Sequence, residues 1–526
     1  MTTLTQANSK TPIFYLLLPS ARDVIFIFLF WSILAGTLSN RPLADPDIGW
    51  HIRNGERILV THEITKTDPF SSTMFGHRWV AWEWLYDILL GILHRVAGLN
   101  GVVWLCALLV ASTFTLLLTQ LMKRGTGLLT AVVLMLLAEG ASTIHLFARP
   151  HIASWVFLLL WFLALERWEA GSRPRWLPWF FPLSILIWVN IHGAWLLGLA
   201  LLAIYTIASG VRAFIDSDPL QAILSAKRAR AQGLAWCGSA VATLANPFGW
   251  HLHLHVYRYL SDRYLINRIS EFHSPDFHGW AQRCFGILLL LTLISLSRRR
   301  WKIPISHFLT ILFLVYVGLF SSRNLPISSM LLVLMIGPHL SAEVDALAQN
   351  PAASLRLRNI VGRIAGSSRR MTPQELQFRH HLWPTVCVVG ALVICMQGGW
   401  VGSRHLLQAG FDPKLVPVAA VDFLESRPDV IPVFSTDSWG GYLIYRLYPS
   451  RQVVVDDRHD LFGTDRIREL LILMQGEPGW HDILNRWDIR IALLPADASL
   501  ASLLRELPQE WQITYRDKVS VIFERR

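Results

Sequence analysis

Two aspartates, Asp45 and Asp47, stand where the first long apolar stretch of the chain ends, at the start of the segment DPDIGWHIRNGERIL. Water at a membrane boundary solvates a carboxylate cheaply, so the two acids could simply end a helix and begin a turn. A carboxylate in that place could also act as a general base that takes the proton of an acceptor hydroxyl. The pair alone does not decide between a turn and a catalytic site.

Other polar side chains near the ends of apolar segments could meet the aspartates in one aqueous cavity. Ionisable residues are costly to place close to the membrane interior, which makes them functional candidates by default. A guanidinium such as that of Arg149 could hold a phosphate, although an arginine before Pro150 could equally mark a helix end. With Asp45 and Asp47 as the catalytic pair, the predicted substrate-binding residues are His51, Arg53, Asp68, Glu83, Arg149, His151, His192 and Arg323.

Other motifs point to no chemistry. The run HLHLH at 251–255 looks like a metal cluster, but no carboxylate or cysteine stands at ligand spacing beside it, so we interpret it as a wet helix face. None of the five cysteines forms a metal-binding or disulfide pattern. The chain has no P-loop, GxSxG, HExxH or GxGxxG motif, which leaves ATP-driven transport and soluble dehydrogenase chemistry without support.

The composition indicates which elements position these residues. Hydrophobic residues make up 53% of the 526 residues and charged residues only 16%, whereas about a quarter of a soluble domain is charged. The 23 tryptophans favour membrane interfaces. The chain is therefore a polytopic membrane protein in contact with the lipid bilayer. Its net charge of +11 sits mostly in clusters between apolar segments, which is a topology signal, so no nucleic-acid partner is expected.

About eleven transmembrane helices are predicted, because a helix needs about 20 largely apolar residues to cross the hydrocarbon core. The predicted spans are residues 22–39, 100–121, 128–146, 151–167, 177–190, 193–211, 233–247, 283–297, 304–320, 325–343 and 382–398. The segment 83–98 is short for a membrane span, and it carries charged residues. If it lies along the surface, the basic clusters all fall on one side, including RRRWK at 298–302 and a basic connecting loop over 344–380.

The positive-inside rule then places the N-terminus in the cytoplasm. The predicted organisation is a transmembrane domain over residues 1–399 in the cell (inner) membrane and an extracytoplasmic domain over residues 400–526. The first outer loop, residues 40–99, would carry amphipathic interfacial helices.

Residues 400–526 alternate strand-like runs such as DIRIALLPAD with helical stretches such as GTDRIRELLILM. This alternation predicts a small, autonomous α/β domain with a largely parallel sheet. The two glycines in SWGGYLIYRL fit a tight turn or a close backbone approach. The domain is expected to shape the acceptor side without supplying the base. Four of its acids could bind a hydroxylated acceptor or solvate strand ends, and we favour the second interpretation: Asp437, Asp456, Asp457 and Asp460.

The organisation resembles the GT-C superfamily of membrane glycosyltransferases, which includes oligosaccharyltransferase catalytic subunits and protein mannosyltransferases. Shared features are an N-inside first helix, an outer loop that opens with acids, many further spans and a soluble outer domain. Over nearly the whole chain, a group of bacterial multi-pass GT-C-like proteins is similar in the motifs DPDIGWHIRNGERIL, TDPFS, WVAWEWL, ARPH, NPFGW, EFHSPDF, SSRNLP, WGGYLIYRL and VVVDDRHDLFG. Superfamily members commonly carry Asp-Glu, or a single Asp before Pro, where this chain has Asp-Pro-Asp.

The resemblance implies an inverting enzyme of the hexosyltransferase class. Such an enzyme moves a sugar from a polyprenyl-phosphate carrier to a glycan, lipid or protein acceptor at the outer membrane face. A lipid-phosphate donor requires no nucleotide-binding domain. The Asp-Pro-Asp variant leaves open which of Asp45 and Asp47 is the base, and it also leaves open whether a divalent metal ion takes part.

Two other functions are alternatives. A transporter or flippase of lipid-linked glycans would place polar residues and discontinuous helices at the bilayer midplane, whereas the polar motifs of this chain gather on one side. A non-catalytic membrane scaffold for envelope glycan assembly would leave the acids of the first loop and Arg149 without a role.

Overall fold

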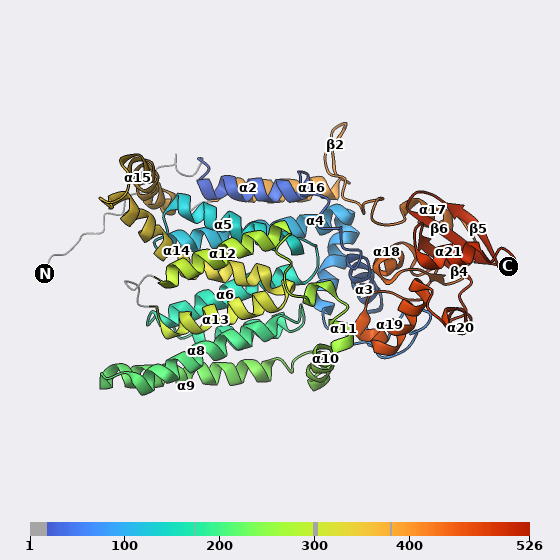
Figure 1. Cartoon of the computed structure of the whole chain (residues 1–526), viewed down its shortest axis with the longest axis horizontal. Coiled ribbons are helices and arrows are strands. Elements are labelled where there is room, and N and C mark those ends of the chain that lie inside the picture. Colours follow the sequence, from blue (N-terminus) through green and yellow to red (C-terminus); the bar gives the residue numbers. More distant parts are fainter. Residues whose placement is uncertain (1–17, 173, 298–302, 379–380) are drawn as a thin grey trace.

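The computed structural model describes residues 18–172, 174–297, 303–378 and 381–526. A bundle of long helices forms one end of the molecule and an α/β domain forms the other, with the first loop between them (Figure 1). The bundle and its connections comprise α2 (Ala21–Leu34), α3 (Ile48–Thr61), α4 (Trp84–Lys123), α5 (Leu128–Ser142), η1 (Thr143–His145), α6 (His151–Glu169), α7 (Leu177–Trp188), α8 (Trp195–Ile215), α9 (Pro219–Ala242), α10 (Trp250–Ser261), α11 (Arg263–Ile266), η2 (Ser270–Phe272), α12 (Trp280–Ser297), α13 (Ile305–Phe320), η3 (Ser322–Asn324), α14 (Leu325–Gln349), α15 (Leu355–Gln377) and α16 (Leu382–Met396).

Six helices in the described part of the chain are long and apolar enough to cross a bilayer, or seven if the bent pair α15 and α16 forms one span. The helical membrane domain is thus confirmed, but the count of about eleven spans is not. Several predicted spans form short helices: α2 has 14 residues, α7 has 12 and α16 has 15. At 1.5 Å per residue such helices are only about 18–23 Å long, which is less than the roughly 30 Å hydrocarbon core.

The predicted interfacial segment, residues 83–98, corresponds to the first part of α4. The helix breaks at Gly98, whose backbone (φ 60°, ψ −154°) suits glycine. Before the break, α4 packs backbone to backbone on α3, since a Cβ added to Gly91 would lie 2.7 Å from the carbonyl carbon of Gly55. α3 and the part of α4 before the break lie between the bundle and the α/β domain (Figure 1).

Basic residues collect at the opposite end of the bundle. Arg22 at the start of α2 lies 3.0 Å from Glu375 of α15, and Arg124 after α4 lies 2.7 Å from Glu166 of α6. The first contact joins the start of α2 to the region 344–380, which the sequence predicts to lie on the cytoplasmic side of the membrane. The cluster at 298–302 lies outside the described residues.

The region 344–380 is largely helical, which corrects the predicted loop. α14 continues to Gln349, and α15 follows at the end of the bundle away from the α/β domain (Figure 1). The hydroxyls of Ser368 and Thr372 accept hydrogen bonds from the N–H groups of Leu129 and Leu128. These bonds satisfy free N–H groups at the start of α5 and hold α15 against the bundle.

The sheet of the α/β domain is mixed, which corrects the largely parallel sheet predicted from the sequence. β3 pairs parallel with β4, while β6 pairs antiparallel with both β4 and β5, in the order β3-β4-β6-β5. Only residues 517–519 separate β5 from β6, and so short a connection permits a hairpin but no crossover. The elements are β1 (Trp400–Val401), β2 (Arg404–His405), α17 (Val418–Glu425), β3 (Val433–Phe434), α18 (Asp437–Leu447), α19 (His459–Gln475), α20 (Trp480–Arg486), β4 (Ile491–Pro495), α21 (Ser499–Arg505), β5 (Trp511–Arg516) and β6 (Ser520–Arg525).

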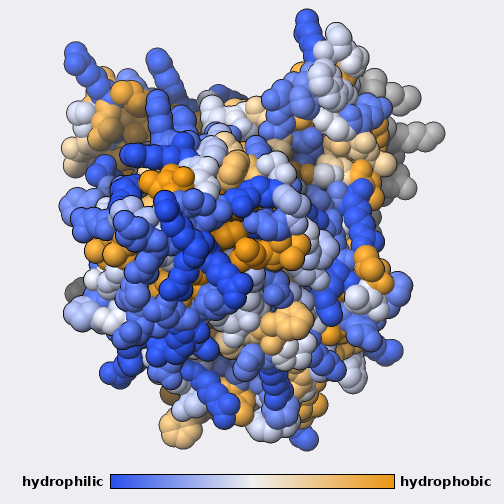
Figure 2. All heavy atoms as spheres, turned by 90° about the vertical axis from the view of Figure 1, so that its right-hand side faces the viewer, coloured by the Kyte–Doolittle hydropathy of each residue, from blue (hydrophilic) through white to orange (hydrophobic). Residues whose placement is uncertain are grey.

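The α/β domain shares its core with the first loop, which corrects the prediction of an autonomous unit. Its apolar cluster includes Trp50, Phe70 and Trp79. The predicted close approach of the glycine pair is confirmed, because a Cβ at Gly441 of α18 would lie 2.4 Å from the carbonyl oxygen of Pro46. Hydrophilic residues cover most of the end of the molecule that this domain forms (Figure 2), as expected for a surface in water.

Candidate active site

Asp45 and Asp47 lie in the turn between α2 and α3, and Asp47 is the N-cap residue of α3. The N–H of Asp47 donates to Oδ1 of Asp45 over 3.1 Å, so the chain turns tightly here. Both carboxylates nevertheless contact one guanidinium: Nη1 of Arg149 lies 2.6 Å from Oδ2 of Asp45 and 3.2 Å from Oδ2 of Asp47. The structure therefore brings the two aspartates and Arg149 together.

A third carboxylate, that of Asp457, reaches this pair from the α/β domain. One oxygen from each of Asp45, Asp47 and Asp457 lies within 4.8 Å of the other two. Burial, together with the negative charge of Asp45, raises the pKa of Asp457 to about 7. The interpretation of Asp457 as a solvated strand end is thus corrected, because its side chain faces the other two acids.

The three carboxylates fit a divalent cation. Oδ1 of Asp47 and Oδ1 of Asp457 are buried, and neither accepts a hydrogen bond within the described part of the chain. Carboxylate oxygens are preferred ligands of Mg²⁺ and Mn²⁺. Asp45, Asp47 and Asp457 would hold the ion, and its charge would offset the repulsion between them.

Beside the acids lies a cavity of about 90 Å³ between the bundle, the first loop and the α/β domain. Its walls combine aromatic rings with charged groups, as ligand sites commonly do. They include Asp47, Trp50, Trp79, Trp82, Glu83, Arg149, Tyr259, Arg323, Asp457 and His459. A second hollow of about 160 Å³ adjoins this cavity and shares Trp79 and Asp460 with it. A ligand larger than the first cavity could therefore extend into the second.

A chain of buried polar groups lies along the first-loop side of the cavity. Nδ1 of His51 lies 2.6 Å from Asp87, which orients the ring so that Nε2 faces Glu83 at 3.7 Å. The other carboxylate oxygen of Glu83 lies 3.9 Å from Nε2 of His192. Burial lowers the pKa of His51 to about 3 and raises that of Glu83. His51 thus favours its neutral form, and Glu83 holds a proton more readily than an exposed glutamate does.

Glu271 links the two arginines of the site. Its Oε1 lies 3.9 Å from Nη1 of Arg149, and its Oε2 lies 3.9 Å from Nε of Arg323. Burial acts to raise the pKa of Glu271, but the two positive charges outweigh it and lower the pKa to about 2. Arg149 thus faces three carboxylates. The Arg323 side chain is 32% exposed and lines the cavity, so it is the arginine better placed to meet a ligand.

Two residues of the predicted substrate-binding set lie away from the cavity. Arg53 donates through Nε to the carbonyl of Tyr445 over 2.6 Å and pairs with Glu56. Asp68 forms a buried ion pair with Arg458 over 2.8 Å. Both residues connect the first loop to the α/β domain, and neither lines the cavity. The structure therefore gives them a fastening role in place of the predicted contact with substrate.

His151 and His192 lie behind the cavity wall, with ring centroids 6.3 Å apart. Nε2 of His151 is hydrogen-bonded to the carbonyl of His145 over 2.7 Å. Nδ1 of His192 is hydrogen-bonded to Ser154 over 2.9 Å, while its Nε2 lies 3.4 Å from Nη2 of Arg323. His192 thus reaches the cavity through Arg323, whereas His151 does not reach it.

The residues of the site that the predicted set lacks include four polar ones: Asp87, Tyr259, Glu271 and Asp457. Glu271 and Asp457 occur in the outer segments EFHSPDF and VVVDDRHD, so a charged group in an unusual outer motif was the available signal. For Asp87 and Tyr259, no spacing in the sequence links them to the aspartates. Only the packing of α3 on α4 and the position of α10 bring them to the site.

No family model and no curated protein matches the chain. The chain is similar to the solved archaeal oligosaccharyltransferase AglB from Archaeoglobus fulgidus in complex with an inhibitory peptide and a dolichol-phosphate. The TM-score is 0.58 at 11% identity, over 96% of this chain and 74% of that chain. The Archaeoglobus fulgidus oligosaccharyltransferase tethered with an acceptor peptide containing the NVT sequon gives a TM-score of 0.55 at 12% identity, over 98% and 74%.

The same archaeal enzyme in complex with Zn and sulfate gives a TM-score of 0.54 at 12% identity, over 96% of this chain and 73% of that chain. At such low identity the likeness bears on the fold alone. A helical membrane bundle followed by an α/β domain matches these neighbours over nearly the full length of this chain. The chain therefore shares the overall fold of these archaeal oligosaccharyltransferase structures.

Proposed function

We propose that the protein is a glycosyltransferase that moves a sugar from a polyprenyl-phosphate carrier to an acceptor at the extracytoplasmic membrane face. The meeting of Asp45, Asp47 and Asp457 between the helical bundle and the α/β domain carries this proposal. A lipid-linked donor and a water-borne acceptor can both reach that boundary. Two neighbours in fold support it, since one was solved with a dolichol-phosphate and another with an acceptor peptide.

The general base is Asp47. Both oxygens of Asp45 are already engaged, one by the N–H of Asp47 and the other by Arg149. Oδ1 of Asp47 is buried and has no partner within the described part of the chain, so it can accept the proton of an acceptor hydroxyl. As that hydroxyl oxygen bonds to the anomeric carbon, the bond from this carbon to the phosphate oxygen breaks, and the electron pair leaves with the lipid phosphate.

Positive charge at the cavity stabilises the departing phosphate. Arg323 lines the cavity and is partly exposed, and a guanidinium binds phosphate oxygens in a bidentate manner. A divalent cation held by Asp45, Asp47 and Asp457 would supply further positive charge to that phosphate when bound. Asp47 can contact the ion and the acceptor together, because a carboxylate offers about four lone pairs.

The acceptor enters by the second hollow, which opens between α10 and the start of α19. Its lining includes Arg78, His255 and Arg258, which can donate hydrogen bonds to hydroxyl, carboxylate or phosphate groups, and Asp460, which can accept one from a hydroxyl. Trp79 lies at the junction with the first cavity. An acceptor held here would present its hydroxyl toward the aspartates.

A deletion strain tests the function. Loss of the gene should remove one envelope glycan from the profile, and the wild-type gene should restore it. Asp47→Asn should fail to restore the glycan at equal expression. The matched control is Asp422→Asn, since Asp422 is an exposed acid on α17 that pairs with Arg446, and it should restore the glycan fully. An unchanged glycan profile in the deletion strain would remove the proposal.

Reporter fusions test the orientation separately. A fusion after Lys123 should report the cytoplasm, and a fusion after Val401 should report the extracytoplasmic side. The expectation follows from the basic residues at the end of the bundle away from the α/β domain. If both fusions report the same compartment, catalysis cannot be placed on the outer face by this topology.

A further inference from the structure

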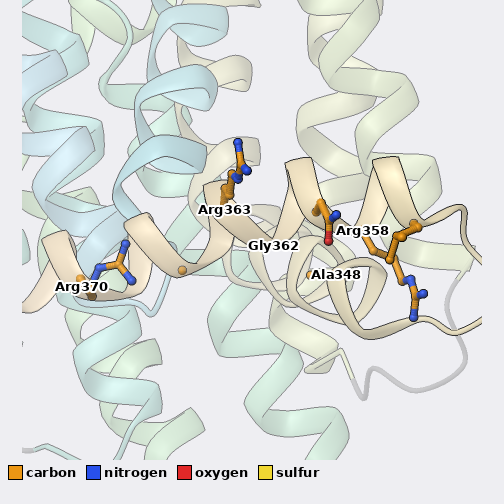
Figure 3. A pocket seen from close by; sticks show the side chains of 8 residues that line it. Ala348, Arg358, Gly362, Arg363 and Arg370 are labelled. Atoms are coloured by element: carbon orange, nitrogen blue, oxygen red, sulfur yellow. The ribbon is translucent and has the colours of Figure 1, made fainter.

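The molecule has a second charged hollow, far from the aspartates. A groove of about 710 Å³ lies between the end of α14 and α15. Figure 3 shows Arg358, Arg363 and Arg370 spaced along α15 beside Ala348 of α14. The space between the arginines is open, because a Cβ added to Gly362 would meet no atom within 4 Å. The groove can therefore admit a ligand without any rearrangement of the backbone.

The charges in this groove are not matched by the protein. Arg369 on the same helix pairs with Asp345 over 2.9 Å, but Arg358, Arg363 and Arg370 have no acidic partner within the described part of the chain. Nε of Arg358 is also buried and makes no hydrogen bond there. Unpaired guanidiniums around one hollow favour an anion with several oxygens, and phosphate fits their geometry best.

A strip of exposed apolar residues on the same helix indicates where such a phosphate comes from. Leu357 is 42% exposed, Ile360 59%, Ile364 42% and Met371 43%. Spacings of three, four and seven residues place these side chains on one face of α15. Arg363 follows Ile360 by three residues, a spacing that places the two side chains next to each other on the helix, so a guanidinium borders the strip. An apolar face edged by basic residues is the pattern of a helix that lies in the headgroup layer of a bilayer.

We propose that the groove between α14 and α15 binds the headgroup phosphate of an anionic glycerophospholipid, whose acyl chains follow the apolar strip of α15. The inner face of α15 is already held by Ser368 and Thr372 at the start of α5, at the end of an apolar membrane helix. The arginines therefore sit at the depth where headgroups begin. This site is separate from the proposed catalytic chemistry and does not depend on it.

Native mass spectrometry of the purified full-length protein, titrated with phosphatidylglycerol, tests the proposal. Arg363→Gln/Arg370→Gln should weaken binding of the first lipid about tenfold or more, because each basic group near an anionic headgroup contributes on the order of fivefold. Lys227→Gln/Arg230→Gln is the matched control. It removes the same charge from exposed positions of α9, beside the Arg228–Glu169 ion pair, and should change binding less than about twofold.

A charge-preserving variant guards against loss through misfolding. Arg363→Lys/Arg370→Lys keeps both charges and should retain most of the phosphatidylglycerol binding, with an unchanged melting temperature. Three outcomes would overturn the proposal. The first is an equal loss of lipid binding in Arg363→Gln/Arg370→Gln and in the α9 control variant. The second is equally tight binding of phosphatidylcholine. The third is displacement of the lipid by millimolar inorganic phosphate, which would indicate a site for a soluble anion.

Discussion

Two groups of charged residues connect the first loop to the segment 456–458, and they use their carboxylate oxygens differently. In the first group, Asp68, Asp456 and Arg458, every carboxylate oxygen receives a hydrogen bond. The three side chains are at most 2% exposed, and the guanidinium of Arg458 lies 4.5 Å from the ring centroid of Trp79. This group fastens the loop to the α/β domain.

The second group, Asp45, Asp47 and Asp457, leaves two buried oxygens without a donor in the described structure. The guanidinium of Arg149 contacts only two of these acids in the described structure, Asp45 over 2.6 Å and Asp47 over 3.2 Å. Asp456 and Asp457 are neighbours in the chain, yet one completes an ion pair with Arg458 and the other faces Asp45 and Asp47. A buried polar group without a partner calls for an explanation, and the proposed cation and acceptor would supply one.

The largest expected effect is on turnover. Asp47→Asn should lower the rate of sugar transfer by about a hundredfold to ten-thousandfold, the usual loss when a positioned base is removed. Its free energy of unfolding should change by less than about 1 kcal/mol, because the substitution also relieves repulsion between acids. A transfer assay and a thermal melt on the same preparation measure both. Near-normal turnover would move the base to another residue.

The fastening group should respond in the opposite way. Arg458→Met leaves two buried carboxylates unpaired and should lower the free energy of unfolding by about 3–5 kcal/mol. Adding Asp68→Asn and Asp456→Asn to that variant should recover part of the loss, since no charge is then left unpaired. Chemical denaturation of the three proteins measures the difference. Equal stability of Arg458→Met and wild type would refute the distinction between the two groups.

The sequence was sufficient for features set by local pattern. Asp45, Asp47 and Arg149 each stand at the end of an apolar run, so their meeting at one boundary could be expected. β4 and α19 follow from DIRIALLPAD and GTDRIRELLILM in the same way. The fold that the chain shares with the archaeal oligosaccharyltransferase structures was also expected from its resemblance to membrane glycosyltransferases.

Features set by tertiary partners could not be predicted. Arg53 and Arg323 are both arginines in outer segments. Only the fold shows that Arg53 donates to the carbonyl of Tyr445, whereas Arg323 lines the cavity. Asp457 comes to the aspartates because α18 packs on α3 through Gly441 and Gly49, a contact between regions far apart in the chain. The number of spans stays unconfirmed for a related reason, since hydropathy does not show where an apolar helix ends.

The pH dependence of metal binding should separate Asp457 from its neighbours. Its pKa is raised from 3.8 to about 7 by burial and by Asp45, so the folded protein holds this proton more tightly than the unfolded chain does. The resulting stabilisation is complete below pH 4 and disappears as the pH rises through about 7. Because a metal needs the ionised carboxylate, affinity for Mn²⁺ should fall by up to about tenfold per pH unit below pH 7.

Calorimetric titration with Mn²⁺ at several pH values measures this slope. Asp457→Asn should bind the ion more weakly and should lose the slope near pH 7, because asparagine does not titrate. Asp437→Asn serves as the control, since Asp437 pairs with His459 and has a lowered pKa through that contact despite its burial. A slope that persisted in Asp457→Asn would assign the titrating group to another residue.

The smallest expected effect concerns Arg53, and it sharpens the comparison between fastening and binding residues. Arg53→Gln loses the hydrogen bond to the carbonyl of Tyr445 and the ion pair with Glu56. The side chain of Arg53 is 25% exposed and that of Glu56 is 17% exposed. A loss of about 0.5–1.5 kcal/mol in the free energy of unfolding follows from one such hydrogen bond. The KM for the lipid-linked donor should stay unchanged, because Arg53 does not line the cavity.

Arg323→Gln should do the reverse and raise that KM at nearly unchanged stability. If both variants raised the donor KM equally, Arg53 would have to reach the substrate, and the cavity beside Asp47 would not be the donor site.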